Sequence, residues 1–276
     1  ANPLLRSLVV DEARASKTMV DILQGYGAVP DPRLTLILSK SQAWVQGKDG
    51  AEEWKGVPNG LPVTELSLPE YDNNHNSCIW GYMWGYDWNS AEKGDNHSKP
   101  KTDADFTPLG LMNYSEVCFL KAEAALRGWQ GAGDAKTNYE NGIRASFEEM
   151  RANAPKDSYS KSNDDKYISE GNVAWNNADS FEAKLEKIIT QKWIGIYPNS
   201  EEAWAEFRRT GYPKLNPVKQ SLEPTINPKN GEFIKKLRYV DNELSNNKEY
   251  ATDPTLNGGQ GDGLSVRVWW DTARYK

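Results

Sequence analysis

The feature that most constrains the fold of this chain is the segment LMNYSEVCFLKAEAALRGWQGAGDAKTNYENGIRASFEEM, residues 111–150. Its first half predicts a helix from about Tyr114 to Arg127, which the sequence RGWQGAGD then breaks. Asp134 can cap a second helix. The apolar residues of that helix recur every three or four positions, at Ala135, Tyr139, Ile143, Phe147 and Met150. The segment therefore predicts a helix–turn–helix unit.

The first of these helices carries apolar residues on more than one side, so we expect it to be buried on two faces. They are Val117, Leu120 and Ala124 on one side, and Cys118 and Ala125 on the other. Its alanines keep it slim enough for close approach of a second helix. A unit of about 34 residues with small residues at the crossing resembles a tetratricopeptide repeat.

A second antiparallel helix pair is expected C-terminal to the first. The segment SFEAKLEKIITQKWIGIY has a clean helical stripe, and in the segment after it Asn199 with Glu202 fits a capping box. Trp204 and Phe207 lie three apart and are expected to face inward, and Gly211 ends the helix. Residues 151–180 between the pairs are polar and are expected to form a loop. The fold class is therefore mainly α, with tetratricopeptide-like helix pairs.

Outside these pairs the pattern is less regular. Near the start, RASKTMVDILQGYG predicts a helix capped by Ser16, and DPRL predicts a turn into an apolar segment. Residues 45–110 contain no long helical pattern and many Gly, Pro, Asn and Asp residues, which predicts a long, irregular, loop-rich insertion. Near the end, VRVWW predicts a short strand or an extended closing segment.

The loop-rich insertion contains SCIWGYMWGYDWN, in which an aromatic residue occupies every second position. We call residues 80–88 the aromatic run; its rings are those of Trp80, Tyr82, Trp84, Tyr86 and Trp88. An extended chain would place all five on one face. A helix is the alternative, because the three Trp residues are four apart, but two glycines in the run weigh against it.

Two interpretations of the aromatic run remain open. The rings can pack on the helical core, or they can form a platform on which sugar rings stack. Neighbouring amides and carboxylates, such as those of Asn76 and Asp87, suit the binding of sugar hydroxyls. We expect a mixture, in which some rings anchor the loop and one or two are exposed. Trp44 and Trp54 are weaker ligand-binding candidates.

Composition and missing motifs exclude several classes of function. A net charge of −6 and a pI near 5.2, without a Lys/Arg-rich run, argue against a nucleic-acid partner. The run GGQGDG lacks the Lys-Ser/Thr of a phosphate-binding loop, and no GxSxG or HExxH motif occurs. His75 and His97 lie in polar segments that match no metal-binding pattern. We therefore expect no catalytic residue, metal or cofactor, and no membrane-spanning helix.

Three smaller questions concern cysteines and carboxylates. Cys118 is expected to be a small core residue, and a bridge between Cys78 and Cys118 has little support. Glu202 and Glu206 are four apart and are read as a solvated helix face, paired with Arg208 or Arg209. A helical glycan-cleaving enzyme would instead need two facing carboxylates in a cleft, one with a raised pKa.

Several blocks of the sequence, in order, resemble the SusD/RagB-like family of Bacteroidetes outer-membrane proteins, in particular its starch-binding branch. These blocks are SKTMVDIL, DPRL, YSEVCFLKAEAALRGW, YENGIRASFE, QKWIGIYPNSEEAWAEFRRTGYP, LRYVDNELSNN and VWWD. The resemblance implies that residues 1–276 form a single SusD-like domain. Family members carry an N-terminal lipid-anchor cysteine and a further helical half. We therefore expect this chain to be the C-terminal part of a longer precursor.

The resemblance also implies a function without catalysis. It implies a cell-surface protein, lipid-anchored in the outer membrane, that captures oligosaccharide and delivers it to a SusC-like TonB-dependent transporter. Two alternatives remain: a peptide-capturing member of the family, and a helical-repeat scaffold that binds proteins and no small ligand. In EAWAEFRRTGYP, Arg208 or Arg209 is expected to tie the helix end to neighbouring carbonyls or acids.

Overall fold

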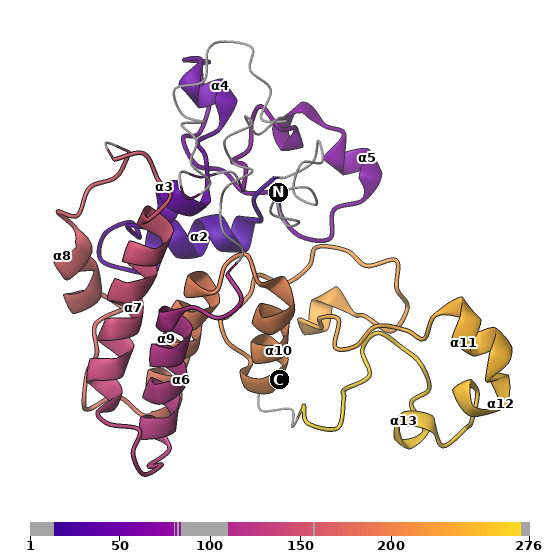
Figure 1. Cartoon of the computed structure of the whole chain (residues 1–276). Helices are drawn as coiled ribbons and strands as arrows, with labels where there is room; N and C mark the ends of the chain where they lie inside the picture. The colour runs from indigo at the N-terminus through magenta and orange to yellow at the C-terminus, as the bar shows by residue number, and fades with distance from the viewer. Residues whose placement is uncertain (1–13, 80, 82, 84–109, 157, 272–276) are drawn as a thin grey trace.

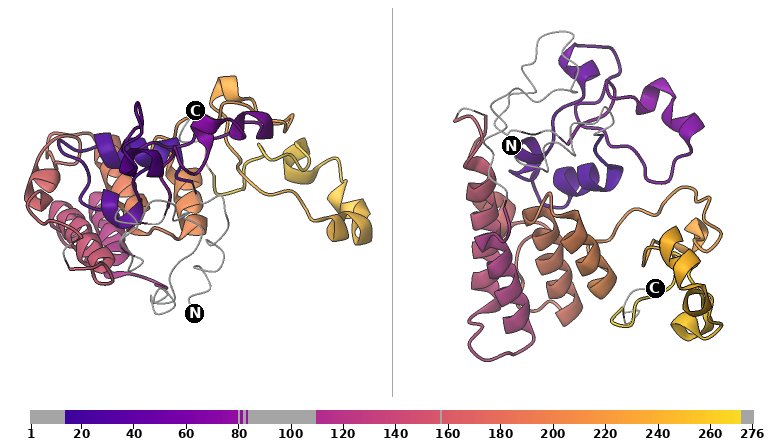
Figure 2. Two further views of the ribbon diagram at one scale, coloured as in Figure 1. Left: turned by 90° about the horizontal axis from the view of Figure 1, so that it is seen from above. Right: turned by 45° about the vertical axis from the view of Figure 1, so that its right-hand side comes forward.

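The computed structural model describes residues 14–79, 81, 83, 110–156 and 158–271. Helices and four isolated β-bridges make up the regular structure of this part of the chain, in which no strand is formed. The mainly α fold class is confirmed. Four longer helices form the centre, the N-terminal segment lies across one end of them, and the C-terminal segment extends beyond α10 (Figures 1 and 2).

The central helices are two antiparallel pairs, as the sequence predicts. Their bounds are α6 (Tyr114–Leu126), α7 (Ala135–Arg151), α9 (Phe181–Gly195) and α10 (Ser200–Thr210). The predicted caps form: the Asp134 side chain accepts a hydrogen bond from the Thr137 amide at 2.8 Å, and Asn199 accepts one from Glu202 at 3.3 Å. In each cap the side chain accepts a hydrogen bond from a backbone amide of the first turn, which has no partner within the helix. Gly211 (φ 80°) ends α10 in the left-handed region, as predicted.

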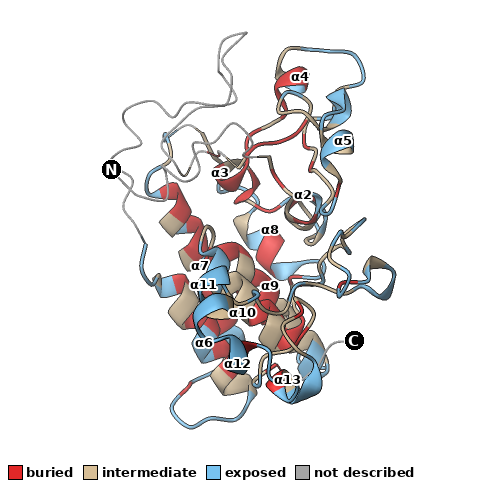
Figure 3. Cartoon of the chain, turned by 90° about the vertical axis from the view of Figure 1, so that its right-hand side faces the viewer, coloured by how far each residue is buried: buried red, intermediate tan, exposed pale blue. Residues whose placement is uncertain are grey.

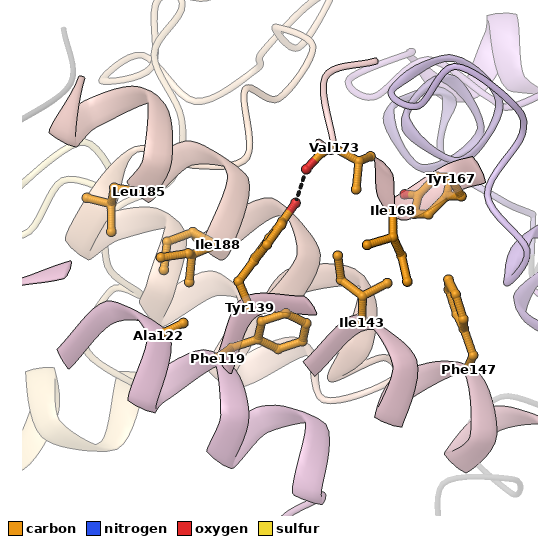
Figure 4. Packing of buried hydrophobic residues seen from close by; sticks show 11 residues of the cluster. Phe119, Ala122, Tyr139, Ile143, Phe147, Tyr167, Ile168, Val173, Leu185 and Ile188 are labelled. Carbon is orange, nitrogen blue, oxygen red and sulfur yellow. Dashed lines mark hydrogen bonds between the residues drawn. The ribbon is translucent and has the colours of Figure 1, made fainter. Parts of the chain in front are cut away.

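The main core lies between α6, α7 and α9 (Figure 4). Its buried residues are Phe119, Ala122, Tyr139, Ile143, Phe147, Tyr167, Ile168, Val173, Leu185, Ile188 and Ile189. The Tyr139 hydroxyl donates to the Val173 carbonyl at 2.8 Å, so this buried ring leaves no polar atom unpaired. A Cβ at position 142 would lie 2.7 Å from the Phe119 ring. Gly142 therefore sets how closely α6 and α7 approach.

Two expectations about this region are wrong. The segment 151–180 is not only a loop, because it forms α8 (Asp164–Ser169), which adds the buried Tyr167 and Ile168 to the core. Helix α6 is not buried on two faces either. One side packs on α7 and α9, whereas Leu120 on the opposite side is exposed.

The N-terminal segment contains α2 (Lys17–Gly25) and several short helical turns. These are α3 (Leu34–Ile37), α4 (Gln42–Val45), α5 (Val63–Leu66) and the 3₁₀ turn η1 (Pro69–Tyr71). The predicted α2 cap forms, with Ser16 Oγ accepting from the Met19 amide at 3.2 Å. Apolar residues of α2 and α3 form a second core cluster, which Met150 of α7 and Ile194 of α9 complete.

A buried polar network fastens this segment to the helices. Arg33 is fully buried and binds Asp31 through Nε at 2.9 Å and Nη2 at 2.6 Å. It also donates to Ser146 of α7 at 2.9 Å and to Gln191 of α9. Burial lowers the pKa of Arg33, but the Asp31 carboxylate outweighs burial and the pKa is raised. The guanidinium therefore stays charged inside the protein.

The C-terminal segment has little buried surface. It contains η4 (Pro228–Asn230), α11 (Asp241–Asn246), α12 (Lys248–Ala251) and α13 (Leu256–Gly259). Figure 3 shows α11 and α12 mainly exposed, in contrast to the buried stretches of α7, α9 and the region around α3. The VRVWW segment is extended or in turns and forms no strand within residues 264–270.

Candidate functional site

The five rings of the aromatic run, Trp80, Tyr82, Trp84, Tyr86 and Trp88, lie outside the described residues, so their role stays a prediction. The structure does describe residues next to the first rings of the run, namely Cys78, Ile79, Gly81 and Met83. The Cys78 carbonyl accepts from the Ser39 amide at 3.0 Å, and the Ile79 carbonyl accepts from the Tyr197 hydroxyl at 3.0 Å. The aromatic run therefore begins where the chain is attached both to the segment after α3 and to the end of α9.

The described residues at odd positions of this stretch contact the core. Ile79 and Met83 pack against the second core cluster. Gly81 is buried, and a Cβ there would lie 2.2 Å from the Leu36 carbonyl oxygen, closer than any side chain can approach. Only glycine lets the backbone pass α3 at this distance.

The two weaker aromatic candidates differ from each other. Trp54 is 9% exposed and belongs to the second core cluster, so the suggestion that it binds ligand is wrong. Trp44 is 40% exposed, and Lys40 Nζ lies 4.6 Å from the centre of its ring. The lysine occupies a face on which a ligand would stack.

The polar candidates Asn76 and His75 act in local structure. Asn76 is fully buried, and its side-chain amide donates to two backbone carbonyls at 3.0 and 2.9 Å. Asp72 Oδ1 accepts from the backbone amides of Asn74 and His75 and lies 2.8 Å from His75 Nδ1, which makes a compact turn. Burial raises the pKa of Asp72 but these hydrogen bonds outweigh it, so the pKa is lowered. His97 lies outside the described residues. Across the described ranges, no three His, Cys, Asp or Glu side chains are grouped as a metal site.

Both cysteines are buried, and neither forms a disulfide bond. The prediction that Cys118 is a small core residue is confirmed. Cys78 is attached through its backbone to Ser39, and a bridge between the two cysteines is not formed.

The carboxylates of α6 and α10 surround a buried lysine. Lys192 of α9 lies 2.8 Å from Glu202, 3.5 Å from Glu206 and 3.7 Å from Glu116. Glu206 is buried, so the reading of Glu202 and Glu206 as a solvated face is wrong for Glu206.

Glu116 has the raised pKa that a general acid needs. Burial is the main cause, opposed by Lys192 and reinforced by Glu202 and Glu206. The cavity beside Glu116 has a volume of about 20 Å³, room for about one water and none for a sugar ring. The geometry is that of a buried ionic cluster and gives no support to glycan cleavage at this position.

A larger hollow opens on the side of α6 that was predicted to be buried. We call it the α6–α10 hollow; its volume is about 770 Å³. It is lined by Leu120, Glu123, Ala124, Arg127, Trp129, Phe181, Glu206 and Arg209. Trp129, in the turn between α6 and α7, is 67% exposed, and the Arg127 guanidinium lies 5.5 Å from the centre of the Phe181 ring.

Ion pairs fix the floor of the hollow. Arg209 donates to both carboxylate oxygens of Glu123 at 2.7 Å and to Glu206 at 2.7 Å, and Arg127 Nε donates to Glu123 at 2.9 Å. Burial raises the pKa of Glu123, but the two arginines outweigh burial and the pKa is lowered. Burial lowers the pKa of Arg209, and the two glutamates raise it by more. Glu123 and Arg209 therefore stay charged at neutral pH.

Part of this arrangement is predictable from the sequence. The prediction that Arg208 or Arg209 ties the end of α10 to carbonyls or acids is confirmed for both residues. Arg208 donates to the Lys235 carbonyl at 3.0 Å and stacks 3.7 Å from the centre of the Trp204 ring, while Arg209 binds acids. Phe207 faces inward as expected. The hollow itself was missed, although Trp129 in a helix–helix turn was a signal for it.

Comparison with known proteins gives a consistent result. The family model described as SusD-like, Susd and RagB outer membrane lipoprotein, matches residues 1–271. No relative matches among curated proteins. The described helices include none long and apolar enough to cross a membrane.

Solved structures of SusD homologues resemble this chain over nearly its whole length. A homologue from Bacteroides vulgatus ATCC 8482 has 29% identity and a TM-score of 0.71, with 100% of this chain and 52% of that chain covered. A chitin-binding homologue from Flavobacterium johnsoniae has 30% identity and a TM-score of 0.67, with 98% and 52% covered. This chain thus spans about half the length of the solved structures it matches. On the match of the family model and these structures, the chain belongs to the SusD-like family of outer-membrane lipoproteins.

Proposed function

We propose that this protein captures an oligosaccharide at the outer-membrane surface and delivers it to a SusC-like TonB-dependent transporter, without catalysis. The observation that carries the proposal is membership of the SusD-like family, some of whose solved members bind chitin. The acidic charge and the small cavity beside Glu116 are consistent with binding of a neutral ligand without cleavage.

The aromatic run is the proposed sugar platform. Its described odd-numbered residues contact the core, and on this proposal the rings at the even-numbered positions lie on the other face of the chain. On this proposal Trp80, Tyr82, Trp84, Tyr86 and Trp88 offer ring faces to the C–H surfaces of pyranose rings. Binding by a shallow surface of this kind is expected to be weak to moderate, because little area is buried.

Calorimetry with a panel of oligosaccharides and peptides tests the proposal. We expect an oligosaccharide to bind, and Trp80→Ala, Trp84→Ala or Trp88→Ala to weaken that binding at least tenfold while the circular dichroism spectrum is unchanged. Trp269→Ala is the matched control, because Trp269 is exposed and far along the chain from the run. Normal binding by all three variants would remove the aromatic run from the site. Binding of peptides alone would favour the peptide-capturing alternative.

Delivery to a transporter is tested separately. We expect the protein to co-purify with a TonB-dependent transporter from outer membranes solubilised in mild detergent. Recovery of the protein without any such transporter would leave capture as its function and argue against delivery.

A further inference from the structure

We propose that the α6–α10 hollow is a second sugar-binding site, separate from the aromatic run, that holds a neutral pyranose ring against Trp129. The inference takes its ligand class from the proposed function and its location from the structure. The volume of about 770 Å³ lies within the range of small-molecule sites, which is about 300–1,000 Å³. Trp129 is 67% exposed, although a ring of this size usually buries most of its surface.

The charges of the hollow decide which ligand it suits. Its lining contains two glutamates, Glu123 and Glu206, and two arginines, Arg127 and Arg209. The two negative and two positive charges of the lining sum to zero. They are also paired with one another: Arg127 and Arg209 donate hydrogen bonds of 2.7 to 2.9 Å to Glu123. A charged ligand would find no unbalanced opposite charge there. A neutral ligand with hydroxyl groups can share the remaining hydrogen-bonding capacity of the same carboxylates and guanidinium groups.

The distribution of apolar surface favours a sugar over a wholly apolar occupant. Leu120, Trp129 and Phe181 supply apolar surface, whereas the charged pairs form the floor. A wholly apolar segment laid over that floor would remove water from charged groups without replacing its hydrogen bonds. A pyranose ring has both a C–H face for the aromatic rings and hydroxyl groups for the charged side chains.

The charged side chains of the hollow are also held in place before a ligand binds. The Glu123 and Glu206 side chains are each 10% exposed, and the ion pairs with Arg209 hold them in place. Because these side chains are already ordered, a ligand would lose little affinity to ordering them.

The hollow lies away from the point where the chain enters the aromatic run. The turn between α6 and α7 lies at the end of this helix pair that is farther from α3 (Figure 1). The chain enters the aromatic run beside the segment that follows α3. Helix α6 has 13 residues, which corresponds to about 20 Å. A ring bound at Trp129 therefore does not contact the segment beside α3. Two separated sites on one protein raise the avidity for long or branched glycans.

The test uses protein labelled with 5-fluorotryptophan, so that each Trp gives its own fluorine NMR signal. Trp129→Phe assigns the Trp129 signal and keeps an aromatic ring at this exposed position. The probes are neutral hexasaccharides: chitohexaose, cellohexaose, maltohexaose and xylohexaose. We expect at least one of them to shift the Trp129 signal saturably. Arg127→Gln should weaken the binding that this signal reports about tenfold, and Trp269→Ala should leave it unchanged.

The outcomes separate this inference from the proposed function. A saturable Trp129 shift that persists when Trp80, Trp84 and Trp88 are all changed to Ala supports an independent second site. If a probe shifts the signals of those three residues but never that of Trp129, the second site is ruled out and the proposed function stands. If no probe shifts Trp129 but an apolar helical peptide does, the hollow is a protein-docking surface and the inference is wrong.

Discussion

Arg209 on α10 holds both carboxylate oxygens of Glu123 on α6: its Nη1 donates to Oε1 and its Nη2 to Oε2, each at 2.7 Å. This bidentate pair joins the two helices that border the hollow, and Arg127 binds the same carboxylate from within α6. Planar two-point pairing of this kind fixes orientation as well as distance. The pair is therefore a structural clamp beneath the proposed second site.

Removing the charge of Glu123 should destabilise the protein. Glu123→Gln keeps the shape of the side chain but leaves Arg209 and Arg127 with a neutral partner. We expect a loss of about 1–2 kcal/mol in the free energy of unfolding, less than for a fully buried pair because Arg209 is about one-third exposed. Urea unfolding measures it. The matched control is Asp21→Asn, which removes an exposed pair with Lys17 and should cost under about 0.5 kcal/mol.

The same pair predicts a pH dependence. The pKa of Glu123 is lower in the folded protein than its ordinary value of about 4.3. Its contribution is therefore fully present above that ordinary value and is lost as the pH falls through the folded-state pKa. The stability difference between the wild type and Glu123→Gln should be constant from pH 6 to 8 and shrink below about pH 4. A difference that grows on acidification would contradict the lowered pKa.

The glycine beside the aromatic run should not tolerate a side chain. Gly81→Ala places a Cβ against the Leu36 carbonyl, so either α3 or the run must move. We expect a loss of about 1–3 kcal/mol and weaker oligosaccharide binding, measured by thermal unfolding and calorimetry. Gly25→Ala is the control, because nothing lies within 4 Å of its Cβ, and it should be neutral or slightly stabilising. Unchanged stability and binding in Gly81→Ala would show that the attachment is dispensable.

The buried network around Arg33 should be sensitive to loss of its cation. Arg33→Met leaves the Asp31 carboxylate buried without its guanidinium partner, which should cost about 3–5 kcal/mol. Arg144→Met breaks an exposed pair with Asp165 and should change stability by less than about 1 kcal/mol. Chemical unfolding of both variants makes the comparison. Equal effects would mean that the network adds no stability to the attachment of the N-terminal segment.

Two tryptophans of the N-terminal segment should behave in opposite ways. Trp54 is in the second core cluster, so Trp54→Ala should cost about 3–5 kcal/mol. Trp44 is partly exposed, so Trp44→Ala should cost far less. Thermal unfolding of both variants tests this contrast. Similar losses in both would place Trp44 in a packing role that its exposure does not suggest.

The regular elements could be predicted because their signals are local. Apolar spacing, the caps at Ser16, Asp134 and Asn199, and the break at Gly211 all act within about one helical turn. The inward position of Phe207 and the anchoring by Arg208 and Arg209 likewise followed from positions on one helix. The family resemblance also came from short ordered blocks, and the family model confirmed it.

The sequence by itself thus determined the helix pairs, the caps and the family. The tertiary structure alone decided that Trp54 is core, that α8 brings Tyr167 to Asp31, and that one side of α6 is open. The physical reason is the separation along the chain over which the deciding interactions act. A helix is stabilised by neighbours three or four residues apart, whereas burial depends on contacts across the fold, such as that of Arg33 with Gln191, 158 residues away. The hollow exists because one side of α6 is left uncovered by the described parts of the fold. No local sequence pattern predicts which side of a helix stays uncovered.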